Sequence, residues 1–172
     1  MMMFQPQQEL KKRGQIKTPM NPILSLTLQA DLRYVRVASL TACNVAKIFA
    51  DFNCDAADIS EFCHAYELAV SEAFTNSVRH AQPSQPETQV TVRISSEHRT
   101  LAVCIIDANP PFNPVTQAPD INSYPEGGYG LFLIHQLMDT VYYARENNTN
   151  TLTMIKQAKM TYTENTWTIN PG

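Results

Sequence analysis

Long hydrophobic runs are missing from this chain of 172 residues. The longest apolar stretches, such as residues 101–106, are far shorter than the roughly 20 residues that a membrane-spanning helix needs. The beginning of the chain has no apolar segment after Lys11, Lys12 and Arg13, so we expect neither a signal peptide nor a membrane anchor there. These absences predict a cytoplasmic protein with no membrane partner.

Basic residues and cysteines are also scarce. Lys and Arg number 13 against 16 Asp and Glu, which gives a net charge of -3 and no basic surface for nucleic acid. The four cysteines are too widely spaced for a zinc site and too few for a disulfide framework: Cys43, Cys54, Cys63 and Cys104. We therefore expect free thiols in the core and no nucleic acid as a partner.

The composition fits one globular domain, because 44% of the residues are hydrophobic and only 17% are charged. Residues 1–20 are polar and carry Pro6, Gly14 and Pro19, so they predict a disordered leader. The folded domain is expected to cover residues 21–160, and residues 161–172 are expected to form a tail without a clear pattern.

Apolar periodicity predicts three helices and five strands in this domain. Alternating or continuous apolar residues indicate strands at 23–29, 88–95, 101–106, 141–145 and 151–157, with a turn at 146–150. Helical spacing indicates helices from about Asp31, a suitable N-cap, to Phe49, from 57 to 80, and after Gly130. Since hairpins outnumber crossovers, we expect an α+β two-layer sandwich, a mainly antiparallel sheet with helices on one face.

The first predicted helix has apolar residues on two sides. Its core side is predicted to carry Leu32, Val35, Ala42, Val45, Ala46 and Phe49. Val37, Leu40 and Ile48 fall off that side. This second patch indicates either a surface for another chain or a deeply buried helix, and periodicity does not choose between the two.

The second predicted helix carries a polar stripe at the edge of the core. Glu72, Asn76, Arg79 and His80 leave one side of the helix. The neighbouring stripe is apolar: Phe62, Tyr66, Ala69, Val70, Ala73 and Ser77. A carboxylate and a carboxamide one turn apart can together bind a hard cation, or the carboxylate can act as a base beside a metal that the amide holds. The alternative is an ordinary solvated helix face.

Two later segments also carry chemically useful groups. Asp107 ends a buried strand, where it can accept a hydrogen bond from an exocyclic amine or simply open a turn before Asn109. A proline-rich loop over residues 108–126 is long enough to be a lid or binding loop. It leads into Gly127, Gly128 and Gly130, where a helix begins and backbone amides can approach an anion.

Taken in order, the segments AVSEAFTNSVRHA, IIDANPPFNP and EGGYGLFLIHQLMD resemble the three motifs of the Bergerat-type (GHKL) ATP-binding fold. Gyrase, Hsp90, histidine kinases and MutL share that fold. The resemblance is strongest to its small branch of bacterial anti-sigma factors with serine kinase activity, and it covers roughly residues 24–157. It implies an ATP-binding protein that uses Mg²⁺.

The resemblance also implies a role for each matching residue. Asn76 would ligate Mg²⁺, Glu72 would be the general base, and Asp107 would contact the adenine amine. The glycines 127, 128 and 130 would hold the phosphates, and residues 111–126 would form the lid. The remaining predicted nucleotide-binding positions are Asn109, Phe112 and Leu131.

One position departs from the family pattern, because Asn109 stands where a glycine is usual. We expect Asn109 to take a positive φ and to point its side chain toward the nucleotide. Two functions follow. The first is a serine kinase that phosphorylates an anti-anti-sigma (STAS-type) antagonist and so controls its own hold on a sigma factor. The second, which Asn109 favours, is a sequestering protein without useful phosphoryl transfer. The resemblance implies a homodimer in either case.

Overall fold

The computed structural model describes residues 20–55, 58–81, 88–111 and 129–159. One five-stranded sheet has the order β1-β2-β3-β5-β4, and all four neighbouring pairs are antiparallel. The strands are β1 (Asn21–Gln29), β2 (Gln89–Glu97), β3 (Thr100–Asp107), β4 (Thr140–Glu146) and β5 (Thr149–Gln157). The helices are α1 (Val35–Asn53), α2 (Ile59–Arg79) and α3 (Tyr129–Leu137), with a short 3-10 turn η1 (Leu32–Tyr34) before α1.

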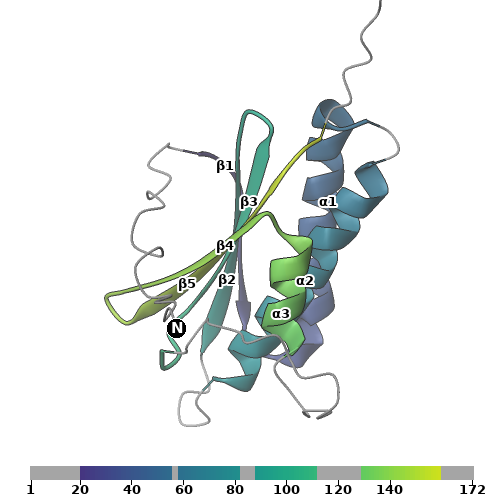
Figure 1. Ribbon diagram of the computed structural model, residues 1–172. Helices are drawn as coiled ribbons and strands as arrows, with labels where there is room; N and C mark the ends of the chain where they lie inside the picture. The colour runs from purple at the N-terminus through teal and green to yellow at the C-terminus, as the bar shows by residue number, and fades with distance from the viewer. Residues whose placement is uncertain (1–19, 56–57, 82–87, 112–128, 160–172) are drawn as a thin grey trace, which may run out of the picture.

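All three α-helices lie on one side of the sheet (Figure 1). This arrangement confirms the predicted two-layer α+β sandwich with an antiparallel sheet. The predicted leader, apart from Met20, and the predicted tail lie outside the described residues. No helix in the described ranges is both long and apolar enough to cross a bilayer.

The core lies between the sheet and α2, as the two periodicities predict. Alternation along β2 and β3 turns one apolar face toward the helices: Val90, Val92, Ile94, Leu101, Val103 and Ile105. The predicted apolar stripe of α2 is buried at every position: Phe62, Tyr66, Ala69, Val70, Ala73 and Ser77. The polar stripe beside it is therefore held at the edge of this core.

Tyr66 fixes α2 to the sheet. Its fully buried hydroxyl donates to the carbonyl of Leu101 at 2.5 Å and accepts from the backbone N–H of Lys156 at 3.1 Å. Burial raises the pKa of the Tyr66 phenol well above its ordinary value, because the phenolate would lose its hydration. The phenol thus links α2 to β3 and β5, and sets where the next turns of α2 stand over the sheet.

The first helix departs from its predicted bounds and core face. Asp31 is the expected N-cap and accepts from the backbone N–H of Arg33 at 2.8 Å. However, α1 runs on to Asn53, past the predicted end at Phe49. Leu32 is 55% exposed, because it lies in the 3-10 turn, whose tighter winding rotates it off the core side. The prediction for Leu32 was therefore wrong.

The second apolar patch of α1 is at the surface. Val37 is 46% exposed and Ile48 is 62% exposed, while Leu40 is half-buried. Phe52, in the extra turn of α1, is 83% exposed. A deeply buried helix would not show this pattern, so that alternative was wrong.

The last hairpin is tighter than predicted. Asn147 and Asn148 have φ values of 49° and 63°, the left-handed pair that a two-residue hairpin turn requires. The expected turn over residues 146–150 was therefore too long. Thr149 and Asn150 instead belong to β5, and Asn150 is buried there.

The central position of β3 agrees with its continuous apolar sequence, although the helices cover only one of its faces. On the other face, Ala102 is buried, while Cys104 and Ile106 are half-buried. All four cysteines are free, as predicted, but only Cys63 is buried. Burial raises the pKa of the Cys63 thiol to about 11, so it is an unreactive core group.

Candidate functional site

The polar stripe of α2 divides into an inner and an outer part. Glu72 and Asn76 are half-buried, one helical turn apart, whereas Arg79 and His80 are exposed at the end of the helix. The core beneath the inner pair is formed by Ala73 and its neighbours. The solvated-face interpretation therefore fits Arg79 and His80, while Glu72 and Asn76 stand at the boundary where a ligand can be bound.

The first turn of α3 meets this inner pair. A Cβ atom placed on Gly130 would lie 2.7 Å from Oε2 of Glu72 and 3.4 Å from Nδ2 of Asn76. Any larger residue would push the Glu72 carboxylate away from this position, whereas glycine lets the backbone of α3 and the carboxylate stay this close. Ile134, fully buried one turn later, anchors α3 against the core. Three of the predicted site residues are thus brought together by the packing of α3 on α2.

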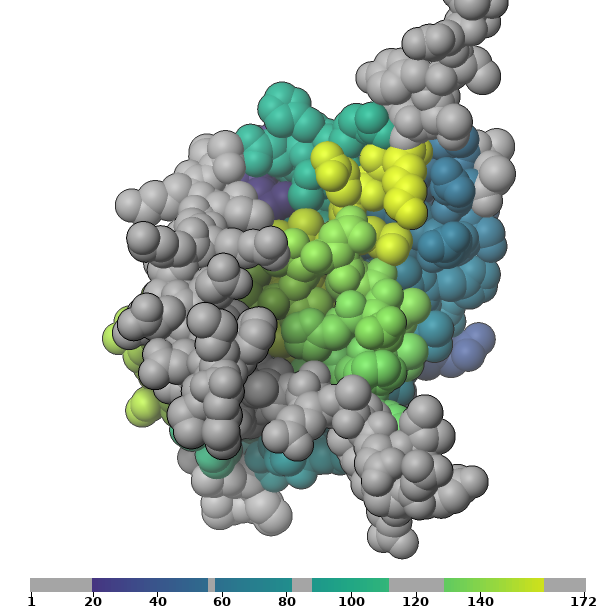
Figure 2. Space-filling view, viewed as in Figure 1, coloured from purple at the N-terminus to yellow at the C-terminus, as the bar shows by residue number. Residues whose placement is uncertain are grey.

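Backbone amides at the start of a helix have no partners within the helix and carry its positive dipole end. In α3 this end lies beside the carboxylate of Glu72 and the carboxamide of Asn76. Leu131, the next residue, is half-buried and packs against the core. Figure 2 shows α3, in green, at the surface, with the end of β5, in yellow, directly above it. The arrangement can bind an anion with donors from α3 and a cation with oxygens from α2.

Asp107 occupies the second part of the site, at the end of β3. It is 8% exposed, and both of its carboxylate oxygens accept hydrogen bonds. Oδ2 accepts from the hydroxyl of Ser77 at 2.6 Å, and Oδ1 accepts from the backbone N–H of Asn109 at 3.0 Å and from Nδ2 of Asn150 at 2.7 Å. The contact with Asn109 is the turn-opening bond, so Asp107 does open the turn.

The same geometry leaves Asp107 able to bind a ligand. A carboxylate has about four acceptor positions, and three of them are used by these protein donors. Donors from the described residues therefore leave one position for an outside donor such as an exocyclic amine. Ser77 follows Asn76 directly in α2, so its hydrogen bond ties Asp107 to the helix that carries Glu72 and Asn76.

Asn109 does not behave as its sequence position suggested. Positive φ values among described non-glycine residues occur only at His98, Asn147 and Asn148, so the turn at Asn109 needs no left-handed residue. Its side chain is 4% exposed and donates to the carbonyl of Ser77 at 2.7 Å. Both expectations for Asn109 were therefore wrong: the side chain turns into the end of α2, because a carbonyl there needs a donor.

Sequence reasoning missed Asn150 and the two residues that hold it. Nδ2 of Asn150 donates to Asp107, and its Oδ1 accepts from the hydroxyl of Tyr143 at 2.6 Å and from the guanidinium of Arg145. The alternation of Met154 and Leu152 continues to Asn150, which places a polar residue on the buried face of β5. Had the Asn147–Asn148 pair been recognised as a two-residue hairpin turn, the sequence would have placed Asn150 within the strand and on its buried face.

Other predicted positions lie outside the described residues: Phe112, Gly127, Gly128 and nearly all of the predicted lid. Within the described ranges no group of three or more His, Cys, Asp or Glu side chains is placed to hold a metal ion. A magnesium site that depends on Asn76 would not form such a group, since Mg²⁺ in nucleotide sites takes most ligands from phosphates and water.

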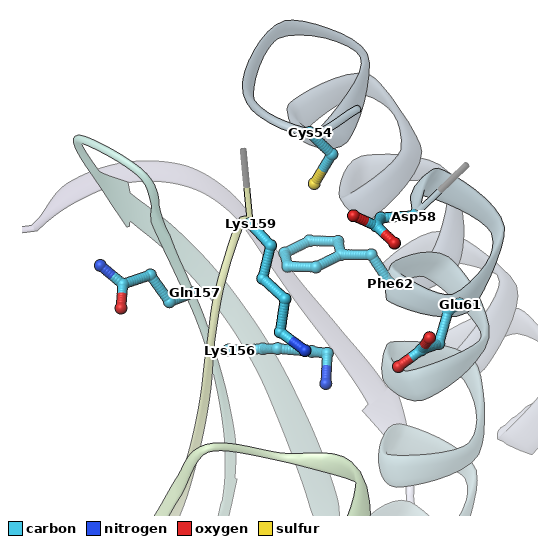
Figure 3. A pocket seen from close by; sticks show the side chains of 7 residues that line it. All are labelled: Cys54, Asp58, Glu61, Phe62, Lys156, Gln157 and Lys159. Carbon is cyan, nitrogen blue, oxygen red and sulfur yellow. The ribbon is translucent and has the colours of Figure 1, made fainter. Parts of the chain in front are cut away.

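A small pocket lies elsewhere, between the end of β5 and the beginning of α2 (Figure 3). Its volume is about 20 Å³, which suits roughly one water molecule. Lys156 and Lys159 lie on one side of it and Glu61 on the other, while the amide of Gln157 points away. Glu61 precedes Glu72 by roughly 16 Å along α2, at about 1.5 Å per residue. The pocket is therefore separate from the candidate site.

Comparison with known proteins gives one family. Residues 28–156 match the histidine kinase-like ATPase domain. The serine-protein kinase RsbW of Listeria innocua is 33% identical over 135 residues, covering 72% of this chain and 82% of that protein. The serine-protein kinase RsbW of Bacillus velezensis is 30% identical over 142 residues, which cover 77% of this chain and 84% of that protein.

A solved structure agrees with the fold. The crystal structure of the RsbU and RsbW domains of Rv1364c from Mycobacterium tuberculosis matches with a TM-score of 0.51 and 19% identity. The match covers 83% of this chain but only 35% of that longer chain. The chain therefore belongs to the histidine kinase-like ATPase domain family, a nucleotide-binding family, and within it to the branch of the RsbW serine-protein kinases.

Proposed function

We propose that this protein binds ATP with Mg²⁺ and transfers the γ-phosphate to a serine of an antagonist protein. One observation carries the proposal. The carboxylate of Glu72 and the carboxamide of Asn76 stand against the bare backbone of Gly130 at the beginning of α3. This proximity supports the proposal, because the proposed base, metal ligand and anion donors would lie together, and phosphoryl transfer needs little beyond such positioning and electrostatics.

The residues present fit both absent groups. Asn76 offers a carbonyl oxygen, the type of ligand that Mg²⁺ prefers, at the edge of the core. A side chain at position 130 would fill the space next to Glu72 and Asn76, so the glycine keeps a backbone surface open to phosphate. Bound ATP would supply the γ-phosphoryl group, which Mg²⁺ makes more electrophilic.

Glu72 is the proposed general base. Its carboxylate is half-buried and lies on the inner part of the stripe, where it can accept a proton from the attacking serine hydroxyl. Asp107 is the proposed adenine contact, through its remaining acceptor position. Leu131 and the residues outside the described ranges, Phe112, Gly127 and Gly128, remain proposed nucleotide contacts, with the loop before α3 as the lid.

The proposed partners are a sigma factor and an anti-anti-sigma protein that competes with it for binding to this chain. On this proposal, the phosphorylation state of the anti-anti-sigma antagonist decides which of the two partners is bound. The exposed apolar patch of α1 supports a homodimer, because Val37, Ile48 and Phe52 lie uncovered on one helix. Symmetric pairing is the usual form of such contacts. A cytoplasmic location is part of the same proposal.

The alternative of a sequestering protein without kinase activity loses its main support. That alternative relied on a side chain of Asn109 directed at the nucleotide. The side chain of Asn109 instead donates to Ser77 within the protein. We therefore favour the kinase, and Glu72 gives a direct way to test it.

Thermal stability tests nucleotide binding itself. A ligand at about a hundred times its Kd stabilises the native state by about 2.7 kcal/mol, which raises the Tm of a chain of this size by roughly 5–10 °C. We expect MgATP to give such a shift, and Asn76→Ala to lose most of it. Gln136→Ala, a change on the exposed side of α3, is the matched control. If millimolar MgATP and MgADP leave the wild-type Tm unchanged, the proposed function is wrong.

A further inference from the structure

Asn109 makes a contact that a glycine at this position could not make. Helix α2 ends at Arg79, and the last carbonyls of a helix lack partners within it. The backbone N–H groups of His80 and Ala81 bond to Asn76 and Val78. The carbonyl of Ser77, between them, accepts from Nδ2 of Asn109 at 2.7 Å. The side chain therefore caps α2 from the end of β3.

Asn150 holds the other side of the same turn. It is 2% exposed and sits directly opposite Asp107 in the pairing of β3 with β5. Its Nδ2 donates to Oδ1 of Asp107 at 2.7 Å and to the carbonyl of Asn109 at 2.9 Å. One amide group thus fixes both the carboxylate and the turn that follows it.

The amide of Asn150 is itself held in one orientation. Its Oδ1 accepts from the hydroxyl of Tyr143 and from the guanidinium of Arg145. Arg145 also donates to the carbonyl of Asn109 at 2.7 Å. Because two donors face the oxygen of this amide, its NH₂ must face Asp107, and a flipped amide would place oxygen against a carboxylate.

We propose that Asn109 and Asn150 are positioning residues that aim Asp107, at the acceptor position that the described residues leave open, toward the exocyclic amine of an adenine base. On this proposal they set the preference for adenine nucleotides without touching the nucleotide. The inference rests on the proposed ATP-binding function. It adds to that function an account of base selectivity. The selectivity would depend on the buried hydrogen-bond network of Ser77, Asp107, Asn109 and Asn150.

The test compares ATP with purine riboside triphosphate, which lacks the exocyclic amine. Both nucleotides carry the same phosphates, so the ratio of their Kd values, measured by calorimetry with Mg²⁺, isolates the contact to the amine. A hydrogen bond to a charged group gives roughly a ten- to hundredfold preference. We expect such a preference for ATP in the wild type, and a ratio within about threefold of one in Asn109→Ala and Asn150→Ala.

The variants differ in how much structure they remove. Asn150→Ala deletes several buried hydrogen bonds, whereas Asn109→Ala deletes the one to Ser77, so Asn109→Ala keeps the test available if Asn150→Ala does not fold. Asn53→Ala is the matched control, because Nδ2 of Asn53 donates to the carbonyl of Phe49 at 2.8 Å at the end of α1. It removes the same kind of helix-terminal bond away from the site, and should keep the wild-type ratio.

Each outcome has one meaning. A ratio near one in Asn109→Ala, with the wild-type ratio kept in Asn53→Ala, supports the proposal. Equal losses of affinity for both nucleotides in Asn109→Ala, with an unchanged ratio, would show a merely structural role and overturn it. Wild-type protein that binds both nucleotides equally would also overturn it, whereas wild-type protein that binds neither would refute the proposed function instead.

Discussion

We predict that the substitution Gly130→Ala slows phosphate transfer without destabilising the folded protein. Position 130 lies in the first turn of α3, so alanine is compatible with its backbone and lowers the entropy of the unfolded chain. Alanine is better than glycine in a helix by up to about 1 kcal/mol. We therefore expect the free energy of unfolding of the ligand-free protein to stay the same or to rise by up to about that amount.

The added methyl group should nevertheless damage the site. Its carbon would lie 2.7 Å from Oε2 of Glu72 and 3.4 Å from Nδ2 of Asn76. Ordinary contacts begin at roughly 3.5 Å, so the Glu72 carboxylate must withdraw by almost 1 Å. A displacement of about 1 Å in a reacting group can cost on the order of 10²-fold in rate. Phosphate transfer should therefore fall by about that factor.

Two measurements check this prediction: urea unfolding without nucleotide, and transfer of labelled γ-phosphate to the antagonist protein. Gln136→Ala, a substitution on the exposed side of α3, is the control and should change neither. If Gly130→Ala transfers phosphate at the wild-type rate while remaining folded, Glu72 is not held against α3 during the reaction. The geometric reasoning would then be refuted.

Two further predictions concern stability and assembly. Tyr66→Phe should cost about 1–3 kcal/mol, because the carbonyl of Leu101 and the N–H of Lys156 lose their partner. Since burial raises the pKa of Tyr66 in the folded state, its stabilising contribution is present below about pH 10 and is lost at higher pH. Urea unfolding above about pH 10 should therefore show a weaker pH dependence in Tyr66→Phe than in wild type. Ile48→Glu should convert a dimer to a monomer in light scattering while the monomer stays folded, because Ile48 is exposed. A wild-type monomer at tens of micromolar would contradict the dimer.

Periodicity and capping predicted most of the fold. The buried stripe of α2 follows a strict helical spacing, so Phe62 through Ser77 were placed correctly on the core side. The errors occur where local geometry departs from the regular repeat. Leu32 lies in a 3-10 turn, and the tight turn at Asn147 shifts the beginning of β5, which a repeat of fixed period does not anticipate.

The candidate site was predictable to different degrees. Glu72 and Asn76 are local neighbours on one helix, so sequence spacing alone brings them together. Their contact with Gly130 depends on how α3 packs, which spacing does not show. Asn109 and Asn150 are the extreme case, because each is satisfied by groups on other elements, and only the assembled strands and helix reveal their partners.

The most direct test of the proposed kinase is Glu72→Gln. Glutamine keeps the size and the hydrogen-bonding capacity of glutamate but cannot take the proton of a serine hydroxyl. We predict that wild-type protein transfers labelled γ-phosphate to the antagonist, that Glu72→Gln does so at least about 10²-fold more slowly, and that both bind MgATP with similar Kd values. Equal transfer rates in the two proteins, or no transfer by wild type with MgATP bound, would contradict the account.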